Sequence, residues 1–311
     1  MKPSRLPLDW FACGLMFVLC ICWGFQQVAI KLTLDDVPSI LQLAVRSGGA
    51  ALVLGALVLW KEGRAAFSDG TLLPGITVGA LFGLEFLFIG EALNHTSASH
   101  VSVFLYTAPM FAALGLHLML PEERLSPVQW LGVLVAFGGI ASAFLGKPAN
   151  APGNMLLGDT YALLGALAWG ATTLVIRGSS LSEANPVKTL FYQLFGAALL
   201  LGVVAFSTGT TEMHLTEKAI VSLVFQVVVI ALVSYLAWFW LLRRYLATRL
   251  SVLSFMTPLF GVSFGVLVLG ETIDLSFAIG ATLVLGGIVL VSGAELLRGR
   301  QRRKALATSE G

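Results

Sequence analysis

The sequence predicts an all-α integral membrane protein: ten transmembrane helices arranged as two inverted five-helix repeats around a central cavity. Composition is the first observation, because 57% hydrophobic residues, 12% charged residues and a mean hydropathy of +0.88 exclude an ordinary soluble domain. The second is a series of ten apolar stretches, each near the roughly 20 helical residues that a hydrocarbon core requires. The third is that residue patterns of the first half recur in the second.

The ten stretches are separated by short connections, which leaves no room for a sizeable domain outside the membrane. The first follows Lys2 and Arg5 as a signal peptide would, but its apolar run is longer than the usual hydrophobic region and lacks a convincing small-residue cleavage site. We therefore interpret it as the first spanning helix. The predicted spans are approximately 10–30, 38–60, 71–92, 98–120, 127–146, 157–177, 187–207, 219–242, 250–270 and 275–296.

The basic residues predict the orientation. With both termini on one side of a ten-helix ladder, 15 of the 19 Lys and Arg residues fall on that side, and only Lys31, Lys147 and Lys218 face the other. The positive-inside rule makes the rich side cytoplasmic and so predicts cytoplasmic termini. We predict a multi-pass protein of the bacterial inner membrane. We interpret the basic tail at 298–311 as an anchor on the lipid surface and predict no nucleic-acid partner.

A repeat organises the chain. Trp23 and Gly24 recur as Trp169 and Gly170, 146 positions later, and Lys31 recurs as Arg177. A second block agrees, because the spacing of Ser102, Pro109 and Glu122 recurs in Ser251, Pro258 and Glu271 at an offset of 149. Five helices is an odd number, so the second copy enters the membrane from the opposite side. We predict one five-helix repeat at 1–148 and the other at 149–297.

Inverted repeats are a recognised plan of secondary transporters, in which the substrate site lies near the midplane between the halves. The run from Ala92 to Pro109, continuing through Pro121-Glu122-Glu123-Arg124 and Gln129-Trp130-Leu131-Gly132, resembles the EamA family of the drug/metabolite transporter superfamily. The run from Ser251 through Thr257-Pro258 and Gly270-Glu271 to Gly286-Gly287-Ile288 is similar to the same signature. The resemblance implies two five-helix halves, a central cavity and export of small metabolites or amino acids.

Arg46 and Glu85 are the charged side chains that lie well inside apolar stretches. Both sit roughly 10 to 14 Å deep at about 1.5 Å per helical residue. Ionisable groups at bilayer depth usually face a cavity or a partner and mark a substrate or ion pathway. Ser39, Gln42, Arg46 and Gly49 share one face, which we expect to meet protein or water, whereas Gly75, Gly79 and Gly83 form a face suited to close helix packing.

Two roles are open for each charge. Glu85 is either a proton-coupling carboxylate or a permanent counter-ion for Arg46, and Arg46 either holds a substrate carboxylate or braces its helix. An offset of 147 places Gln193 in the second repeat where Arg46 sits in the first. The charge is thus confined to one half of the pathway.

Polar residues that follow the repeated Trp-Gly motif and several aromatic residues are further candidates for the cavity wall. Aromatic rings can bind amphiphilic or cationic solutes, although core packing is an alternative role for each ring alone. The candidate substrate-binding or coupling residues, besides Arg46, Glu85 and Gln193, are Trp23, Gln26, Gln27, Tyr106, Trp169, Tyr235 and Trp238.

Prolines occupy matching positions in the two repeats. Pro109 and Pro258 each remove a backbone hydrogen bond near mid-membrane, and we interpret them as hinges, with passive kinks as the alternative. Glu122 and Glu271 end the helices that contain these prolines. We interpret the two glutamates as caps or gate-rim groups rather than as substrate contacts.

Other classes lack support in the sequence. The segment from Ala141 to Pro148 lacks the first Gly and the final Ser or Thr of a phosphate-binding loop, and no HExxH sequence lies at membrane depth. We therefore predict no enzyme, no cofactor and no metal site. The sequence predicts a secondary active exporter of a small metabolite, amino acid or drug-like amphiphile, coupled to protons; the alternative is a facilitative uniporter, exchanger or channel-like pore. A homodimer is compatible with it.

Overall fold

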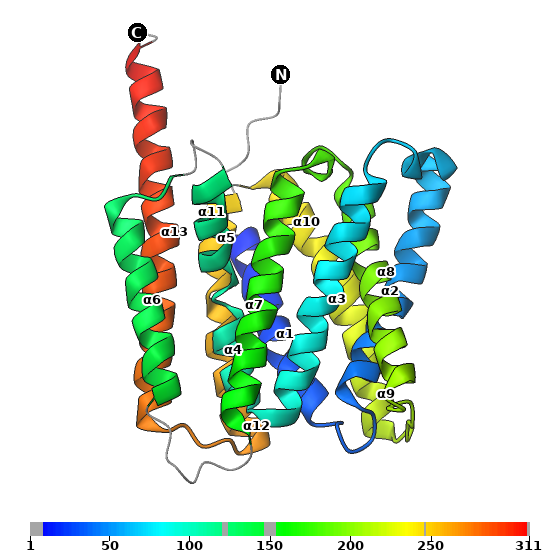
Figure 1. The fold of residues 1–311 in the computed structure, drawn as a ribbon. Coiled ribbons are helices and arrows are strands. Elements are labelled where there is room, and N and C mark those ends of the chain that lie inside the picture. Colours follow the sequence, from blue (N-terminus) through cyan, green and yellow to red (C-terminus); the bar gives the residue numbers. More distant parts are fainter. Residues whose placement is uncertain (1–8, 120–123, 146–153, 246, 310–311) are drawn as a thin grey trace.

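The protein is a bundle of long helices that run side by side along one direction (Figure 1). The structure, a computed structural model, describes residues 9–119, 124–145, 154–245 and 247–309. Within these ranges, 8 helices are long and apolar enough to cross a membrane, and Pro127–Ala143 and Leu275–Val291 form two shorter apolar helices. The all-α membrane fold with ten apolar helices is confirmed.

The first repeat region contains α1 (Trp10–Lys31), α2 (Ser39–Glu62), the short η1 (Arg64–Phe67), α3 (Leu72–His95), α4 (Ala98–Leu105), α5 (Ala108–Met119) and α6 (Pro127–Leu145). The second contains α7 (Met155–Arg177), η3 (Ser180–Ser182), α8 (Pro186–Ser207), α9 (Glu217–Val224), the π-helical η4 (Phe225–Ser234), α10 (Tyr235–Arg244), α11 (Ala247–Ser254), α12 (Met256–Leu269) and α13 (Leu275–Ser309). Helix bounds agree with the predicted spans to within a few residues, except that α13 continues through the basic tail.

Local sequence explains where several helices begin. The Asp9 carboxylate accepts a hydrogen bond from the Ala12 amide at 2.8 Å and caps α1. Asn185 caps α8 by accepting from Val187, and Pro186 follows at the first helical position, where its missing N–H costs nothing. Thr216 accepts from Ala219 at the start of α9.

The fourth and ninth predicted spans are each broken into two helices. The breaks follow Leu105 and Ser254, which are the residues four positions before Pro109 and Pro258. A proline has no N–H to donate to the carbonyl of residue i−4, so the helix loses its continuity at that point. The breaks are present in matching positions, and the role of the prolines as hinges stays a prediction.

Glycine contacts between helices reveal the internal symmetry. A Cβ on Gly24 of α1 would lie 2.7 Å from Cβ of Phe260 on α12, and a Cβ on Gly170 of α7 would lie 3.0 Å from Cβ of Phe111 on α5. The same symmetry relates Gly132 and Gly139 on α6 to Gly280 and Gly287 on α13. The backbones of α6 and α13 touch at these glycines. Each repeat therefore packs its first helix against the penultimate span of the other.

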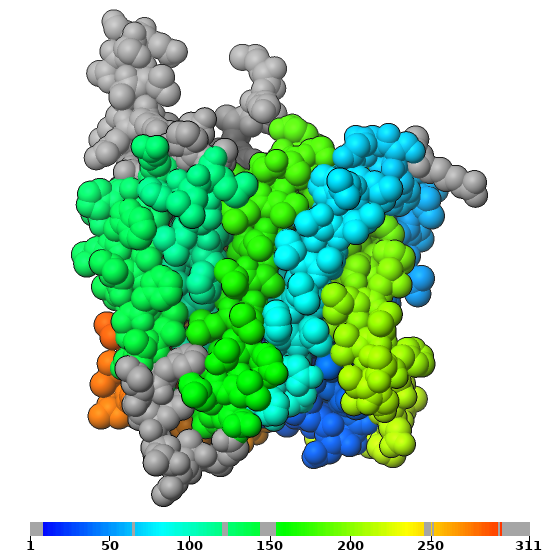
Figure 2. Space-filling view, viewed as in Figure 1, coloured from blue at the N-terminus to red at the C-terminus, as the bar shows by residue number. Residues whose placement is uncertain are grey.

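Helices α2, α3, α7 and α8 pack closely around the middle of the molecule. Figure 2 shows α7, α3 and α8 side by side on one face. The glycine face of α3 meets α8, since a Cβ on Gly83 would lie 3.2 Å from the Ala197 Cα. The polar stripe of α2 is buried, as Ser39, Gln42 and Arg46 are 2%, 0% and 0% exposed. Both predictions about these helix faces are confirmed.

The start of α1 and the end of α13 lie at the same end of the bundle (Figure 1). An even number of spans produces this arrangement, but which side of the membrane that end faces stays a prediction. The predicted boundary between the repeats at 148 and 149 falls outside the described residues and also stays a prediction. Glu122 and Lys147 lie outside them as well.

Candidate functional site

Arg46 is a fully buried cation in the middle of the molecule. It is 0% exposed on α2, and none of its three side-chain nitrogens has a protein hydrogen-bond partner. The Phe86 ring of α3 lies 3.9 Å from the guanidinium carbon and covers one of its faces. A cation–π contact of this kind stabilises a desolvated cation by about 2 kcal/mol, which offsets part of the cost of burying the charge.

Glu85 lies on α3 next to Phe86 and is 5% exposed. One of its oxygens, Oε2, has no hydrogen-bond partner, and Glu85 and Tyr235 are the electrostatic neighbours of Arg46. Within the described residues, no ion pair joins Arg46 to Glu85 at 4.0 Å or less. The structure brings the two charges and Tyr235 into one region but leaves their polar atoms available.

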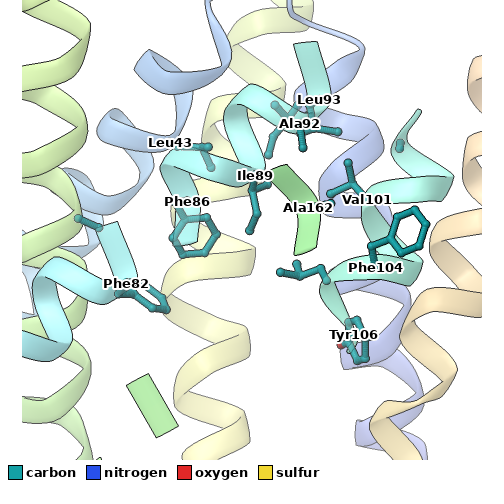
Figure 3. Close-up of a cluster of buried hydrophobic side chains, with 14 of the residues drawn as sticks. Leu43, Phe82, Phe86, Ile89, Ala92, Leu93, Val101, Phe104, Tyr106 and Ala162 are labelled. Atoms are coloured by element: carbon teal, nitrogen blue, oxygen red, sulfur yellow. The ribbon is translucent and has the colours of Figure 1, made fainter. Parts of the chain in front are cut away.

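The surroundings of this region are strongly apolar. Figure 3 shows Phe86 and Ile89 on α3 together with Leu43 of α2 in the buried cluster. All three side chains are buried, with 3% of Phe86 and 0% of Ile89 and Leu43 exposed. In a low-dielectric setting a charged or polar solute group would interact strongly with Arg46 and Glu85.

A buried amide network lies one turn from Arg46. The side-chain amide of Gln226 on η4 donates to Oε1 of Gln42 at 2.8 Å, and Nε2 of Gln42 donates to the Val37 backbone carbonyl at 2.8 Å. The Ser222 hydroxyl of α9 reaches across to the Ala29 carbonyl of α1 at 3.0 Å. The network joins the two repeats beside Arg46, and Gln226 was not among the predicted site residues.

Four of the five aromatic candidates form two separate pairs, and the fifth, Tyr235, lies near Arg46. Trp23 of α1 meets Trp238 of α10 edge to face with centroids 5.7 Å apart, and its indole N–H donates to the Ser234 hydroxyl at 2.8 Å. Tyr106, at the end of α4, meets Trp169 of α7 edge to face at 5.6 Å. The two members of each pair come from different repeats, so both pairs lie where the repeats meet.

The glutamine candidates are buried. Gln26, Gln27 and Gln193 are 6%, 4% and 8% exposed, and the side-chain oxygen Oε1 of Gln27 has no hydrogen-bond partner. The conformation is closed around these residues, so the central cavity stays a prediction. A shallow groove does occur on the outer surface of α8, but none of the predicted site residues lines it; its walls are Ala198, Leu199, Gly202, Val203, Phe206 and Ser207.

A polar cluster that the sequence did not identify lies at the end of the bundle away from the start of α1. Asp159 of α7 accepts from the Thr96 hydroxyl at 2.6 Å, and its two oxygens lie 3.0 Å from Nδ1 of His100. In the motif His95-Thr96-Ser97-Ala98-Ser99-His100, Thr96, Ser99 and His100 are buried. The sequence pattern predicts only a family resemblance for this motif, because its partners come from the other half of the chain. Within the described residues, no group of three or more His, Cys, Asp or Glu side chains could hold a metal ion.

The EamA-like transporter family matches residues 10–145 and again residues 156–293. The chain belongs to the EamA-like transporter family. Its match covers both repeats, so this EamA-like protein is a multi-pass membrane transporter, and the family resemblance of the sequence is confirmed. The two matched segments leave residues 146–155 between them.

Several relatives of this EamA-like protein match over most of their length. The uncharacterized transporter YoaV of Bacillus subtilis is 24% identical over 278 residues, which is 89% of this chain and 94% of the relative. A probable amino-acid metabolite efflux pump of Salmonella typhimurium is 23% identical over 287 residues, covering 89% of this chain and 93% of the pump. A protein of known crystal structure shares the fold, with a TM-score of 0.63 at 21% identity over 94% of this chain and 97% of that chain.

Proposed function

We propose that this protein is a secondary active exporter that binds its substrate between the two repeats, near Arg46 and Glu85, and exchanges it for protons by alternating access. The observation that carries the proposal is the pair of enclosed ionisable groups, Arg46 and Glu85, whose polar atoms lack partners. A charge buried without a partner is costly, and in membrane proteins such groups mark pathways.

The chemistry of Arg46 favours a substrate with a carboxylate. A guanidinium offers a planar set of N–H donors that matches a carboxylate with two parallel hydrogen bonds, and no side chain of the described residues uses these donors. Glu85 has an oxygen available for a substrate ammonium group. An amino acid or a related metabolite would satisfy both charges at once, in keeping with the efflux pumps among its relatives.

Proton exchange would act through Glu85. In this proposal the carboxyl group carries a proton when the substrate is absent and releases it when a substrate ammonium group binds beside it. Because the carboxyl is enclosed, it can exchange a proton only with the side to which the site is open. This requirement would couple proton entry to substrate exit.

The proposal is tested by transport in proteoliposomes. The purified protein is given a panel of amino acids, organic cations and sugars, with and without a pH gradient. We expect one class of carboxylate-bearing solutes to accumulate only when the gradient is present, and Glu85→Gln to remove that response. Glu91→Gln is the matched control, because Glu91 lies on the same helix and its carboxylate is instead 3.9 Å from His95.

Either of two results would contradict the proposal. Saturable transport that ignores the pH gradient in the unchanged protein would indicate a facilitative uniporter or exchanger. A normal pH response in Glu85→Gln would place proton coupling on another residue.

A further inference from the structure

Glu271 joins the second repeat to the first at the end of the bundle where α3 ends and α4 begins. Its carboxylate accepts hydrogen bonds from the Ala98 amide at 2.6 Å, the Ser99 amide at 2.9 Å and the Ser99 hydroxyl at 2.5 Å. The amides belong to the first turn of α4, whose N–H groups have no partner within the helix. A carboxylate from the other repeat therefore caps this helix, and its charge suits the helix N-terminus.

The end of α12 directs this carboxylate toward α4. Gly270 adopts φ +66° and ends the helix, and the Glu271 amide returns to the Gly265 carbonyl at 3.1 Å. A left-handed residue at this position is typical of a glycine C-cap. Gly265 leaves room for the contact, since a side chain there would meet Ser99 and the Glu271 carboxylate.

A second contact between the repeats lies beside the first. Asp159 holds Thr96 and His100, and Gly158 packs so closely on Thr96 that a Cβ would lie 2.6 Å from the Thr96 Cβ. The His100 ring also stacks on Phe277 of α13, with centroids 3.8 Å apart. The corner between α3 and α4 is thus enclosed by α7, α12 and α13.

The corresponding helices at the opposite end are not packed in this way. The repeat offset of 149 relates α4 to α11 and α12 to α5. Helix α4 packs along α12, whereas no comparable packing joins α11 to α5 in the described part of the chain. Among the described residues, α4 and α12 are therefore joined across the repeats, whereas their counterparts α11 and α5 are less closely joined.

We propose that Glu271 is the closing residue of this end: its contact with α4 holds the repeats together in the conformation seen here and breaks when the end opens. The inference rests on alternating access in the proposed function. Rocking one repeat against the other would withdraw Glu271 from α4 and expose both the carboxylate and the helix N-terminus. Glu271 thus sets the balance between the closed and open conformations.

The test measures opening without using transport. Cys13, Cys20 and Cys22 are replaced by Ala, and Ser102→Cys supplies a reporter on α4 one turn from Ala98. Ser102 is 4% exposed and faces Gly261 of α12, so it is shielded while α4 and α12 stay together. The protein is placed in lipid nanodiscs, where a membrane-impermeant maleimide can approach from both sides, and the rate of labelling is measured.

We expect Glu271→Gln to raise the labelling rate about tenfold, the size typical of a lost helix cap. Ser99→Ala removes one of the three hydrogen bonds and leaves the charge, so it should raise the rate by a smaller factor, about threefold. Glu91→Gln, near the same end of α3, should leave the rate unchanged. If Glu271→Gln does not yield a monodisperse protein, Ser99→Ala against Glu91→Gln decides the question.

Labelling of Glu271→Gln or Ser99→Ala at the parent rate would overturn the assignment. Because the readout needs neither a substrate nor a pH gradient, it separates the two proposals. Faster labelling in Glu271→Gln with no proton-coupled transport in the parent would support the closing contact and contradict the proton exporter. Labelling of Glu271→Gln at the parent rate, together with proton-coupled transport in the parent, would contradict the closing contact and support the proton exporter.

Discussion

Two helix crossings at the centre of the molecule occupy equivalent positions in the two repeats and differ in a few side chains. Where α3 crosses α8, Gly79 meets Gly196, and a Cβ on Gly79 would lie 2.6 Å from the Tyr192 carbonyl oxygen. Where η4 crosses α2, the glycine is Gly49, and a Cβ there would lie 3.1 Å from Cγ1 of Val227. The first crossing brings two backbones into contact, and the second is held apart by a valine.

The buried cation lies at the wider crossing. Arg46 is one turn before Gly49, whereas the neutral Gln193 is one turn before Gly196. The wider crossing also contains the π-helical segment η4 and the Gln42–Gln226 contact. Segments of π-helix are frequent at functional sites. The comparison indicates that the glycine crossing fixes the two repeats together, while the valine crossing makes room for a buried charge.

The largest effect is expected from making the two crossings alike. Arg46→Gln gives the wider crossing the same residue type that Gln193 supplies at the narrow one. It also removes the guanidinium that is proposed to bind the substrate carboxylate. The half-saturating substrate concentration should rise roughly 10- to 100-fold, as expected for the loss of a charge-assisted hydrogen bond. Gln193→Ala should change it by less than about threefold. Equal effects of the two substitutions in reconstituted transport would remove the functional distinction between the crossings.

The next effect concerns stability. Gly79→Val imposes the valine of the wider crossing on the narrow one, where the Tyr192 carbonyl oxygen and the Gly196 Cα leave no space. Overpacking of this kind costs about 1 to 3 kcal/mol. The substitution should lower the thermal unfolding temperature in detergent. Gly202→Val is the control, since a Cβ on Gly202 of α8 meets nothing within 4 Å. Similar decreases in unfolding temperature in Gly79→Val and Gly202→Val would show that the close contact at Gly79 does not contribute specifically to stability.

A smaller loss of stability than in Gly79→Val is expected from Val227→Ala. The substitution removes two methyl groups at the wider crossing, and the cost should be about 1 kcal/mol because Val227 can lose contacts without forcing any backbone to move. The thermal unfolding temperature should therefore fall less than in Gly79→Val. A loss larger than that of Gly79→Val would reverse the proposed order of the two crossings.

The smallest effect involves the loop that anchors α8 at the narrow crossing. Asp69 pairs with Lys188 and accepts from the Thr71 hydroxyl at 2.6 Å, and these contacts lower the pKa of Asp69 to about 2. A lowered carboxyl pKa contributes stability that is present above the ordinary value near 4 and is lost as the pH falls toward 2. Asp69 is about half exposed, so solvent screens much of this contribution.

Unfolding temperatures of the parent and Asp69→Asn should therefore differ by a small constant amount between pH 5 and 8. The difference should shrink as the pH is lowered from about 4 toward 2. A difference that instead grew on acidification would mean that the Asp69 contact does not act through its charge.

Much of the fold could be predicted because it depends on local sequence. Hydrophobic length located the spans, and the missing N–H groups of Pro109 and Pro258 explain the breaks after Leu105 and Ser254. Helical spacing correctly placed Arg46 on a buried polar stripe. These features follow from residues within a few turns of one another.

The contacts between repeats could not be predicted in the same way. Glu271 and Ser99 are 172 positions apart, and periodicity carries no information about a pair at that separation. Asp159 lies near the start of a predicted span, and its partners Thr96 and His100 are 63 and 59 positions away in the sequence. The apolar run Phe225–Ser234 also carries no sequence signal for its π-helical hydrogen bonding.

The most direct test of the central claim compares two modes of transport in Glu85→Gln. Counterflow exchanges labelled for unlabelled substrate and needs no net proton movement, whereas accumulation driven by a pH gradient does. If Glu85 is the proton site, Glu85→Gln should retain counterflow and lose accumulation driven by the gradient. Retention of both would contradict proton coupling through Glu85.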